Sequence, residues 1–248
     1  MKEIGAPLIQ LSDVSLSFSN FGFFRRSHFK ALNKVSLAIY PGEILGIVGR
    51  NGCGKSTLLQ VVADIIAPDS GCISKSGNLK SALLTLGLGF NKELTGKDNA
   101  ILSLMLQGFS RWEALERLDV IRDFSELGDF FERPVKTYSS GMRSRLGFAT
   151  ALQAEVDLLL IDETLSVGDK TFNEKAESAL VHKMSGLQTV LFVSHNATQV
   201  ARLCQRALWL EKGEVVAEGA TADVVQAYNA FMVALKKGNA SYRDFWQD

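Results

Sequence analysis

The sequence predicts an α/β fold built around a mostly parallel sheet. Two short segments, "VDLLLID" at residues 156–162 and "TVLFVS" at residues 189–194, are almost wholly apolar and have the length of strands buried on both faces. The polar stretch between them, residues 171–184, has the composition of a helix. Buried strands that alternate with helices are typical of a parallel sheet covered on both sides, which defines the α/β class.

The N-terminal part of the chain supplies further strands. Residues 8–18, "LIQLSDVSLSF", alternate between apolar and polar as a half-buried strand does. Residues 35–40 and 44–49 are two more strand-like segments, and "PGE" between them predicts a turn. Residues 55–67 have the apolar spacing of a helix, which we expect to end before Pro68. A glycine-rich segment therefore connects a buried strand to the start of a helix.

Residues 95–154 have a helical pattern only, with breaks at Gly108, Gly128 and Pro134. This change of composition predicts an inserted helical subdomain. Within it, "KTYSSGMRSRLGF" begins like a loop with two serines and a glycine and continues as a basic, amphipathic run. Ser139 or Ser140 is a good N-cap, so taken alone the segment indicates a capped surface helix.

Size and composition restrict the function classes. The chain has 248 residues, enough for one large or two modest domains, and equal numbers of basic and acidic residues, 27 each. No overall field therefore points toward nucleic acid or anionic lipid. Cys53, Cys72 and Cys204 have no paired or metal-ligand spacing, which indicates a reducing compartment. The sequence offers no signal peptide and no apolar run long enough to span a membrane, so we expect a cytosolic chain whose membrane role comes through a partner.

The glycine-rich segment carries the strongest chemical signal. "GRNGCGKST" fits the pattern G-x-x-x-x-G-K-[ST] through Gly49, Gly54, Lys55 and Ser56, directly after an apolar strand and at the start of a helix. In such a loop the backbone N–H groups surround phosphate oxygens, the lysine reaches the outer phosphates and the serine can bind Mg²⁺. The alternative is a glycine turn that binds nothing.

Acidic and imidazole side chains follow the two apolar strands. Asp162 ends one strand, where it can hold Mg²⁺ through water, and Glu163 is placed to deprotonate the water that attacks the γ-phosphate. Without the glycine loop, an acidic pair at the end of a strand indicates a solvated loop. His195 follows the next strand; it lies at the carboxyl edge of the sheet, where such sheets bind ligands, although a lone histidine is more often structural.

These motifs together resemble a known family. The glycine loop, "YSSGM", "LLLIDE", "SVGD" and "SH", in this order and spacing, resemble the nucleotide-binding subunit of an ATP-binding cassette (ABC) transporter over residues 8–219. The resemblance implies a P-loop NTPase fold of the ABC ATPase type, a mostly parallel sheet plus N-terminal antiparallel strands with an inserted helical subdomain. It also implies a single domain over the whole chain. The expected parts are a nucleotide-binding core at 1–94 and 155–220, a helical subdomain at 95–154, and a short C-terminal helix and tail at 221–248.

The resemblance implies roles for particular residues. "YSSGM" corresponds to the signature motif, which in this family binds the γ-phosphate of ATP held by the glycine loop of the opposite subunit, so two chains would enclose two nucleotides head to tail. Phe18 would stack on adenine, residues 166–169 would form a loop at the dimer interface, and His195 would contact the γ-phosphate. The expected ATP-binding residues are Phe18, Gly49, Asn51, Gly52, Cys53, Gly54, Lys55, Ser56, Thr57, Ser139, Ser140, Gly141 and Asp169. The expected catalytic residues are Glu163 and His195, and the expected Mg²⁺ ligands are Ser56 and Asp162.

Cys53 is peculiar to this sequence, because the loop usually has alanine or serine there. Its place at a helix N-terminus beside Lys55 favours a reactive thiolate that lines the nucleotide site. The alternative is a small buried side chain that fits where alanine would.

Further similarity narrows the expected substrate. "LGLGFNKELTGKDN", "FSELGDFFERPVKTYSSGMRSRLGF", "IDETLSVGD" and "FVSHN" are similar to subunits that power export of cell-surface polysaccharides: O-antigen, capsule or teichoic acid. This implies an ATPase that works as a homodimer with two copies of a polytopic membrane permease on a lipid-linked glycan, without nucleic acid. It would lie on the cytoplasmic face of the bacterial inner membrane and use ATP and Mg²⁺.

Two other protein classes share part of these motifs, and the sequence departs from the family pattern at the glutamine that follows the third core strand. A soluble ABC-type ATPase of DNA repair or translation would usually carry two cassettes or a long coiled-coil insertion. A GTPase or kinase would not need "YSSGM", and the chain has no guanine motif of the "NKxD" type. The family's glutamine after the third core strand has no clear counterpart, since the region offers only Thr85 and Asn91, and neither is assigned.

Overall fold

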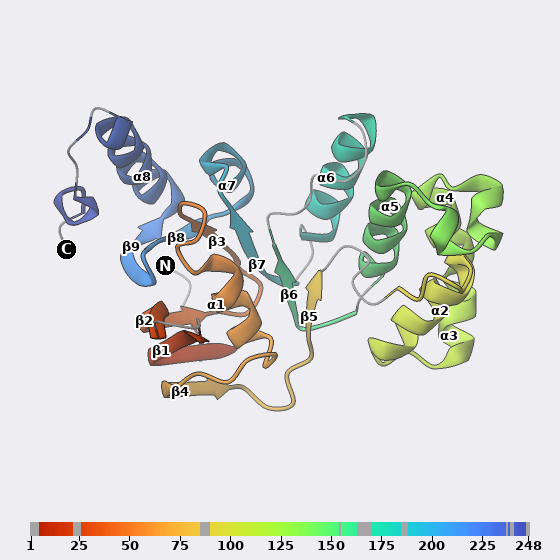
Figure 1. Ribbon diagram of the computed structural model, residues 1–248, viewed down its shortest axis with the longest axis horizontal. Coiled ribbons are helices and arrows are strands. Elements are labelled where there is room, and N and C mark those ends of the chain that lie inside the picture. The colour runs from red at the N-terminus through yellow and green to blue at the C-terminus, as the bar shows by residue number, and fades with distance from the viewer. Residues whose placement is uncertain are drawn as a thin grey trace. The chain divides into compact units, whose positions relative to one another are not determined.

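The structure is a computed structural model that describes residues 5–21, 26–84, 90–153, 155–162, 170–184, 188–236, 238 and 241–246 (Figure 1). It divides into two compact units. The first unit comprises Met1–Leu83, Asp157–Glu163 and Gly186–Asp248, and the second comprises Leu84–Val156 and Thr164–Ser185.

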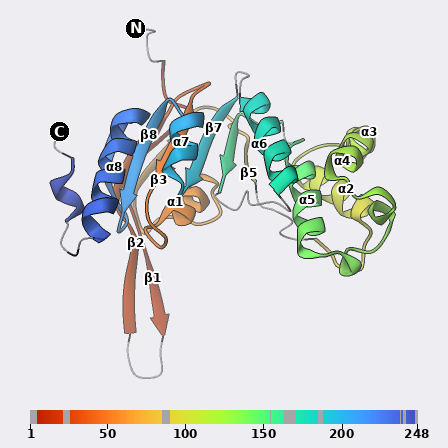
Figure 2. The same ribbon diagram turned by 90° about the horizontal axis from the view of Figure 1, so that it is seen from above.

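The first unit contains a small antiparallel sheet in the order β2-β1-β4. Strands β1 (Ile9–Phe21) and β2 (Arg26–Ile39) form a long two-stranded ribbon, and β4 (Ser70–Lys75) pairs with the other edge of β1 (Figure 2). These are the expected N-terminal antiparallel strands. The inward side chains of β1 and β2 pack into the same hydrophobic cluster as the first helix and the main sheet.

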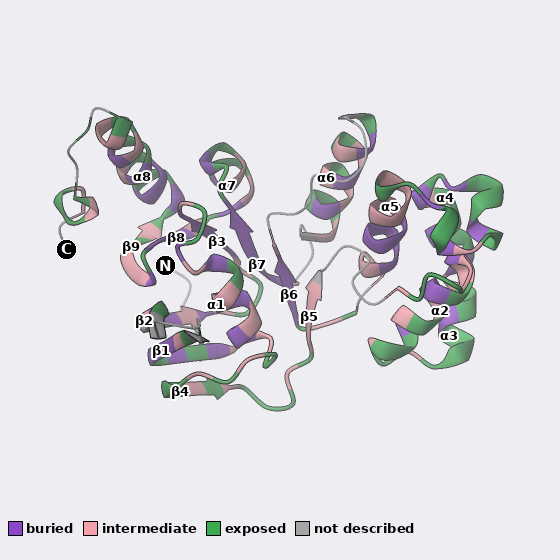
Figure 3. Cartoon of the chain, in the orientation of Figure 1, coloured by how far each residue is buried: buried purple, intermediate pink, exposed green. Residues whose placement is uncertain are grey.

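The main sheet of the first unit has the order β5-β6-β7-β3-β8-β9. Its strands are β3 (Ile44–Val48), β5 (Ser81–Leu84), β6 (Leu158–Ile161), β7 (Thr189–Ser194), β8 (Arg206–Glu211) and β9 (Glu214–Ala220). Strands β6, β7, β3 and β8 are parallel to one another, and every residue of β6 and β7 is buried (Figure 3). The prediction of parallel strands buried on both faces is therefore confirmed.

Strand β9 adds an antiparallel edge that the sequence analysis did not anticipate. A two-residue turn of Lys212 and Gly213 joins it to β8, and both residues have a positive φ, 50° and 78°. This is the backbone of the tight hairpin turn that matches the twist of the flanking strands, and glycine adopts it without strain.

Three helices belong to the first unit: α1 (Lys55–Val62), α7 (Ala197–Leu203) and α8 (Thr221–Lys236). The prediction that α1 continues to residue 67 was wrong. The helix ends at Val62 because Asp64 adopts a left-handed conformation, φ 59°, and the N–H of Ile65 bonds back to the carbonyl of Gln60. Asp is one of the few residues that enters this region of φ at small cost.

The second unit is helical. It contains α2 (Gly96–Leu106), α3 (Arg111–Glu116), α4 (Leu118–Ser125), α5 (Ser140–Ala151) and α6 (Lys170–Met184), with short 3₁₀ turns at Gly128–Glu132 and Val135–Thr137. Gly108 and Gly128 have a positive φ where the helical pattern was expected to break. The observed units differ from the expected boundaries in two respects. The helical unit already begins at Leu84, where the core was expected to continue to residue 94. It also includes α6, because Phe172 on α6 packs edge-to-face against Phe124 and Phe148.

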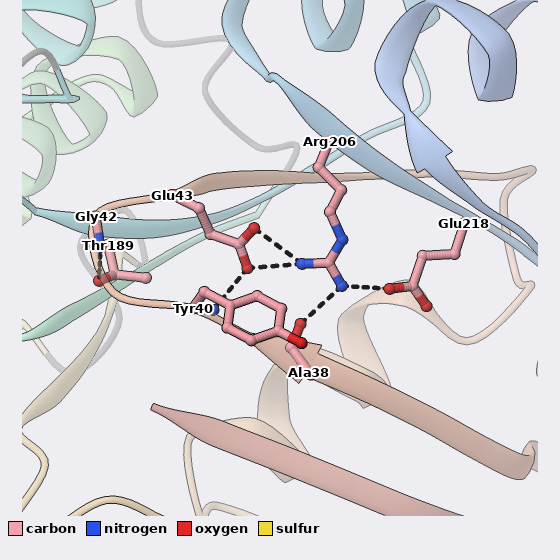
Figure 4. A network of polar contacts seen from close by, with 7 residues as sticks. All are labelled: Ala38, Tyr40, Gly42, Glu43, Thr189, Arg206 and Glu218. Atoms are coloured by element: carbon pink, nitrogen blue, oxygen red, sulfur yellow. Dashed lines mark hydrogen bonds and ion pairs between the residues drawn. The ribbon is translucent and has the colours of Figure 1, made fainter. Parts of the chain in front are cut away.

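A polar network ties the amino ends of two core strands together (Figure 4). The Arg206 guanidinium, at the start of β8, binds both carboxylate oxygens of Glu43 at 2.8 Å, the carbonyl of Ala38 and the carboxylate of Glu218 on β9. Nη1 donates to both oxygens of Glu43, and Nη2 donates to Ala38 and Glu218, so both terminal nitrogens of the guanidinium are held by charge-assisted or carbonyl hydrogen bonds. The network therefore holds the turn before β3 at the end of the strand opposite to the glycine loop.

Candidate functional site

The glycine loop follows the carboxyl end of β3 and opens helix α1. Gly52 and Gly54 have φ values of 78° and 109°, which favour glycine. A Cβ at Gly49 would lie 2.2 Å from the carbonyl oxygen of Leu210, and one at Gly54 would lie 2.4 Å from that of Ala31. The backbone therefore requires glycine at all three positions.

Lys55 is buried at the start of α1, with 7% of its surface exposed. Its ammonium donates to the carbonyl oxygens of Gly49 at 2.7 Å and Arg50 at 2.9 Å. Neither acceptor carries a charge, and no carboxylate of the described chain forms an ion pair with this ammonium. A buried cation that is hydrogen-bonded but not neutralised fits an anionic ligand such as a phosphate chain.

The side chains around Lys55 leave the mouth of the loop polar and open. Asn51 and Ser56 are exposed and Thr57 is half-buried. The Ser56 hydroxyl thus lies on the first turn of α1, next to N–H groups that have no acceptor within the helix.

Three neighbouring parallel strands bring the other core residues to the same edge of the sheet. The order β6-β7-β3 places Asp162, which follows β6, and His195, which follows β7, at the edge where the glycine loop leaves β3. In the register, Ile161 of β6 is level with Phe192, which is level with Gly46 of β3. Since neighbouring strands lie about 4.8 Å apart, Asp162 follows a strand about 10 Å from β3.

His195 is exposed between two anchored neighbours. The Ser194 hydroxyl accepts a hydrogen bond from the N–H of Asn196 at 3.0 Å, and the Asn196 side chain caps α7 by accepting from the N–H of Thr198 at 3.0 Å. The sequence analysis missed these two supporting residues, although Asn directly before an apolar helix is an N-cap signal.

Phe18 lies on β1 with 43% of its surface exposed, directly opposite Phe29 on β2, which is 57% exposed. An exposed aromatic ring of this kind is available for stacking. Phe29 was not predicted as part of the site.

The expectation of a reactive thiolate at Cys53 was wrong. The side chain is 4% exposed, and its sulfur lies 2.7 Å from where a Cβ at Gly49 would stand, beneath the loop. Burial raises the pKa of the Cys53 thiol, and the nearby Lys55 charge offsets this only in part. Cys53 therefore matches the alternative expectation, a small buried side chain that fits where alanine would.

In the second unit, Ser139 caps α5, as the sequence predicts. Its hydroxyl accepts from the N–H of Met142 at 3.1 Å, and Ser139 and Ser140 are both exposed. Tyr138 is buried beneath them and donates to the carbonyl of Phe130 at 2.5 Å; burial raises its pKa to about 12. The first-turn N–H groups of Ser140 and Gly141 have no acceptor within the helix.

Several predicted residues lie outside the described residues: Glu163, residues 166–169 including Asp169, and Thr85. Asn91 is described, and its side chain closes its own loop by accepting from the N–H of Glu93 at 3.0 Å. Within the described ranges, no group of three or more His, Cys, Asp or Glu could hold a metal ion, and no helix is long and apolar enough to cross a membrane.

Comparison with known proteins decides the family. The profile described as "ABC transporter" matches residues 32–166, more than half of the chain and inclusive of the glycine loop, the α5 start and the end of β6. The chain belongs to the ABC transporter family.

Relatives of this ABC chain include exporter ATP-binding proteins. It is 44% identical over 204 residues to the "ABC transporter protein AbcA" of Aeromonas salmonicida, covering 82% of this chain and 66% of that protein. It is 40% identical to the "Teichoic acids export ATP-binding protein TagH" of Lactiplantibacillus plantarum, covering 93% and 63%, and 39% identical to the "O-antigen export system ATP-binding protein RfbB" of Klebsiella pneumoniae, covering 86% of each. The chain thus spans less than two-thirds of the first two.

Solved structures agree on the fold. A dimeric ATP-binding cassette in a post-hydrolysis state, bound to ADP and Pi, superposes with a TM-score of 0.72 at 25% identity, covering 86% of this chain and 98% of that one. A second, the ATP-binding subunit of an ABC transporter, superposes with a TM-score of 0.74 at 22% identity, covering 90% and 93%. The predicted fold class, an ABC ATPase core with antiparallel N-terminal strands and a helical insertion, is confirmed.

Proposed function

We propose that this ABC chain binds and hydrolyses ATP to power export of a lipid-linked cell-surface polysaccharide. The observation that carries the proposal is the buried Lys55 ammonium, which is held only by loop carbonyls in a glycine loop that tolerates no side chain at Gly49 or Gly54. The printed names of the teichoic acid and O-antigen relatives support this class of substrate.

Five groups of this chain would hold Mg-ATP. Lys55 and the N–H groups of the loop would bind the phosphates, and the exposed ring of Phe18 would stack on adenine. Mg²⁺ would be held by the Ser56 hydroxyl and, through water, by Asp162. Phosphate oxygens and waters would supply the remaining ligands, which suits Mg²⁺. When bound, the metal neutralises charge on the phosphates.

Two side chains at the carboxyl edge would act on the reaction itself. The Glu163 carboxylate would accept the proton of the attacking water, and its place in the sequence directly after Asp162 motivates that role. His195, exposed after β7 and fixed by Ser194 and Asn196, would donate a hydrogen bond to the γ-phosphate.

A second copy of the chain would complete the site. The hydroxyls and first-turn N–H groups at Ser139–Gly141 would bind the γ-phosphate held by the partner copy, and Asp169 would lie at the interface. We further propose that this homodimer binds two copies of a polytopic permease at the cytoplasmic face of the inner membrane.

Two substitutions test the chemistry. Glu163→Gln should keep ATP binding and reduce hydrolysis roughly 10²- to 10⁴-fold, because a general base is lost, whereas Lys55→Ala should weaken ATP binding itself. Binding is measured by equilibrium dialysis with Mg-ATP and hydrolysis by phosphate release. If the Glu163→Gln variant hydrolysed ATP at the wild-type rate, the role proposed for Glu163 would be contradicted.

The transport claim needs a cellular readout. The Glu163→Gln chain should fail to restore surface polysaccharide in a strain that lacks the native ATPase, while the wild-type chain restores it. Full restoration by Glu163→Gln would separate export from ATP hydrolysis and contradict the proposal.

A further inference from the structure

The glycine loop is held from one side by the turn between β8 and β9. Three contacts cover the loop from end to end. Gly49 packs so closely on the carbonyl of Leu210 that no side chain fits, and the N–H of Gly213 donates to the carbonyl of Cys53 at 2.8 Å. Between them, the Arg50 side chain donates from Nε to a carboxylate oxygen of Glu211 at 2.9 Å. The phosphate-binding loop is therefore anchored to one hairpin.

The Arg50–Glu211 pair differs from an ordinary surface ion pair. The Glu211 side chain is only 2% exposed, whereas that of Arg50 is 37% exposed. The second oxygen of Glu211 is buried and has no hydrogen-bond partner in the described chain, so Arg50 supplies the hydrogen bond that satisfies this carboxylate. A buried carboxylate is costly unless it is paired. The Glu211 carboxylate therefore favours the one position of the Arg50 side chain in which the two are hydrogen-bonded.

Apart from the pair with Glu211, the contacts of the Arg50 side chain are loose. Its guanidinium carbon lies 6.0 Å from the centroid of the Phe231 ring, and the side chain borders a pocket of about 530 Å³ that Phe231 and Tyr242 also line. The backbone of the same residue is part of the phosphate site, because its carbonyl accepts from the Lys55 ammonium at 2.9 Å. A change in the Arg50 side chain that shifts its own backbone would therefore move an atom that contacts Lys55.

We infer that Glu211 is a positioning residue for nucleotide binding: by fixing Arg50, it sets the conformation in which the glycine loop and Lys55 receive the phosphates. The inference rests on the proposed function, since it assumes that this loop binds ATP. Glu211 touches no part of the ligand site and acts through Arg50, so its loss should affect ATP affinity and leave turnover at saturation unchanged.

The test uses one conservative and one paired substitution in the full chain. Glu211→Gln keeps the shape and one acceptor but removes the charge. The double variant Arg50→Met with Glu211→Leu replaces both charges by apolar side chains, so that neither is left buried alone, and such replacements are often tolerated. The matched control is Glu218→Gln, the same chemical change at a carboxylate that binds Arg206 on the same hairpin without contacting the glycine loop.

We expect the double variant to raise both the Kd for Mg-ATP and the KM for hydrolysis about 10-fold, and Glu211→Gln to raise them by a smaller factor, with kcat within about 2-fold of wild type. Glu218→Gln should leave Kd and KM unchanged. A purely structural role for Glu211 would lower the melting temperature and leave Kd as in wild type.

The inference is overturned if the folded double variant binds Mg-ATP as tightly as wild type, or if Glu211→Gln lowers kcat with KM unchanged. Should the double variant not fold, the Kd of Glu211→Gln decides, since this change keeps the side-chain shape. A wild-type chain that binds no Mg-ATP would overturn the proposed function, and this inference with it.

Discussion

The two regions proposed to bind phosphate, the glycine loop in the first unit and the start of α5 in the second, are supported in opposite ways. The glycine loop is anchored by a hairpin 161 residues away in sequence, and Lys55 is already bonded to the loop. The start of α5 depends on neighbours: Ser139 caps its own helix, and Arg143 donates to the carbonyl of Tyr138 at 2.6 Å. One region is a preformed site, whereas the other offers exposed donors.

The two units also differ in the apolar surface that they leave uncovered. Among the described residues, most of the large apolar side chains that are exposed belong to the helical unit, with Leu106 at 90% and Trp112 at 70% exposed. Exposed apolar side chains are normal singly, and they mark a protein contact site only where they form a contiguous patch. The difference makes the helical unit the first place to look for contacts with the proposed permease.

Mixing two inactive variants tests most directly whether the glycine loop of one chain and the α5 donors of another form one site. Ser139→Arg should destroy the α5 donor site, and Lys55→Ala should destroy the glycine-loop site. If the α5 donors act on the partner's nucleotide, the heterodimer has one intact composite site and one doubly broken site. Phosphate release should then rise clearly above that of either variant alone.

The control for this experiment is each variant alone, at the total protein concentration of the mixed sample. If the mixed sample is no more active than these, either the donors act within one chain or both sites are needed for turnover. Mg-ATP-dependent dimerisation of the Glu163→Gln chain, measured by size-exclusion chromatography, decides between the two: a chain that stays monomeric contradicts the trans role proposed for Ser139.

Cysteine labelling tests whether the glycine loop is as closed as its contacts indicate. Cys72 is exposed, whereas Cys53 and Cys204 are buried, and burial raises the pKa of Cys204 to about 12 and that of Cys53 above its usual value. At neutral pH a maleimide should therefore label Cys72 first. The other two should react roughly 10² times more slowly, through local opening of the fold.

The pH dependence has a definite sign. A thiol whose folded-state pKa is raised stabilises the fold below its unfolded pKa of 9.0, and this contribution is lost as the pH rises through the folded-state value. The contribution of Cys204 to the free energy of unfolding should thus fall between pH 9 and about 12, and chemical denaturation at a series of pH values, compared with Cys204→Ala, measures it. In the labelling experiment at pH 7, rapid labelling of Cys53, detected by peptide mass spectrometry, would contradict its burial.

Gly96→Ala should affect the helical unit alone. A Cβ at this position would lie 2.2 Å from the Tyr138 hydroxyl, which is itself hydrogen-bonded to Phe130. Overpacking of this kind costs roughly 1–3 kcal/mol of unfolding free energy. Chemical denaturation measures it, and ATP affinity of the monomeric chain should be unchanged because Gly96 and Tyr138 belong to a different unit from the glycine loop.

Gly219→Ala is the matched control, since an added Cβ at Gly219 meets no atom within 4 Å. It should change stability by about 0.5 kcal/mol or less. Equal destabilisation by the two changes would show that the contact at Tyr138 is not the cause.

The smallest expected effect concerns Glu93, near the start of the helical unit. It forms an ion pair with Lys136 at 2.5 Å, but both side chains are more than half exposed. Glu93→Lys should therefore change unfolding free energy by about 1 kcal/mol or less and leave ATP binding unchanged. By the family resemblance, it should reduce assembly with the membrane subunits, measured by co-purification; normal assembly would exclude this loop from the contact.

Local signals made much of the site predictable. The strand, glycine loop and helix at residues 44–62 follow one another in sequence, and Ser139 precedes its helix directly, so short-range patterns were sufficient. The β8–β9 hairpin had a local signal as well, a Lys-Gly pair between two strand-like runs, which the sequence analysis passed over.

Tertiary contacts account for the features that were missed. Cys53 has a raised pKa because the fold buries it, an effect that outweighs the local influence of Lys55 and the helix start. The grouping of α6 with the helical unit depends on Phe172 meeting Phe124, 48 positions earlier in the sequence. No pattern within a short window contains such information.

The anchoring of Arg50 by Glu211 also has a consequence for synthesis of the chain. The two residues are 161 positions apart, so at ribosomal speeds of about 5 to 20 residues per second the hairpin emerges roughly 10 to 30 s after the glycine loop. The first unit cannot complete its nucleotide site before β8 and β9 have been made. A nascent or truncated chain would thus carry the full glycine motif without its support, and ATP would stabilise only chains synthesised beyond this point.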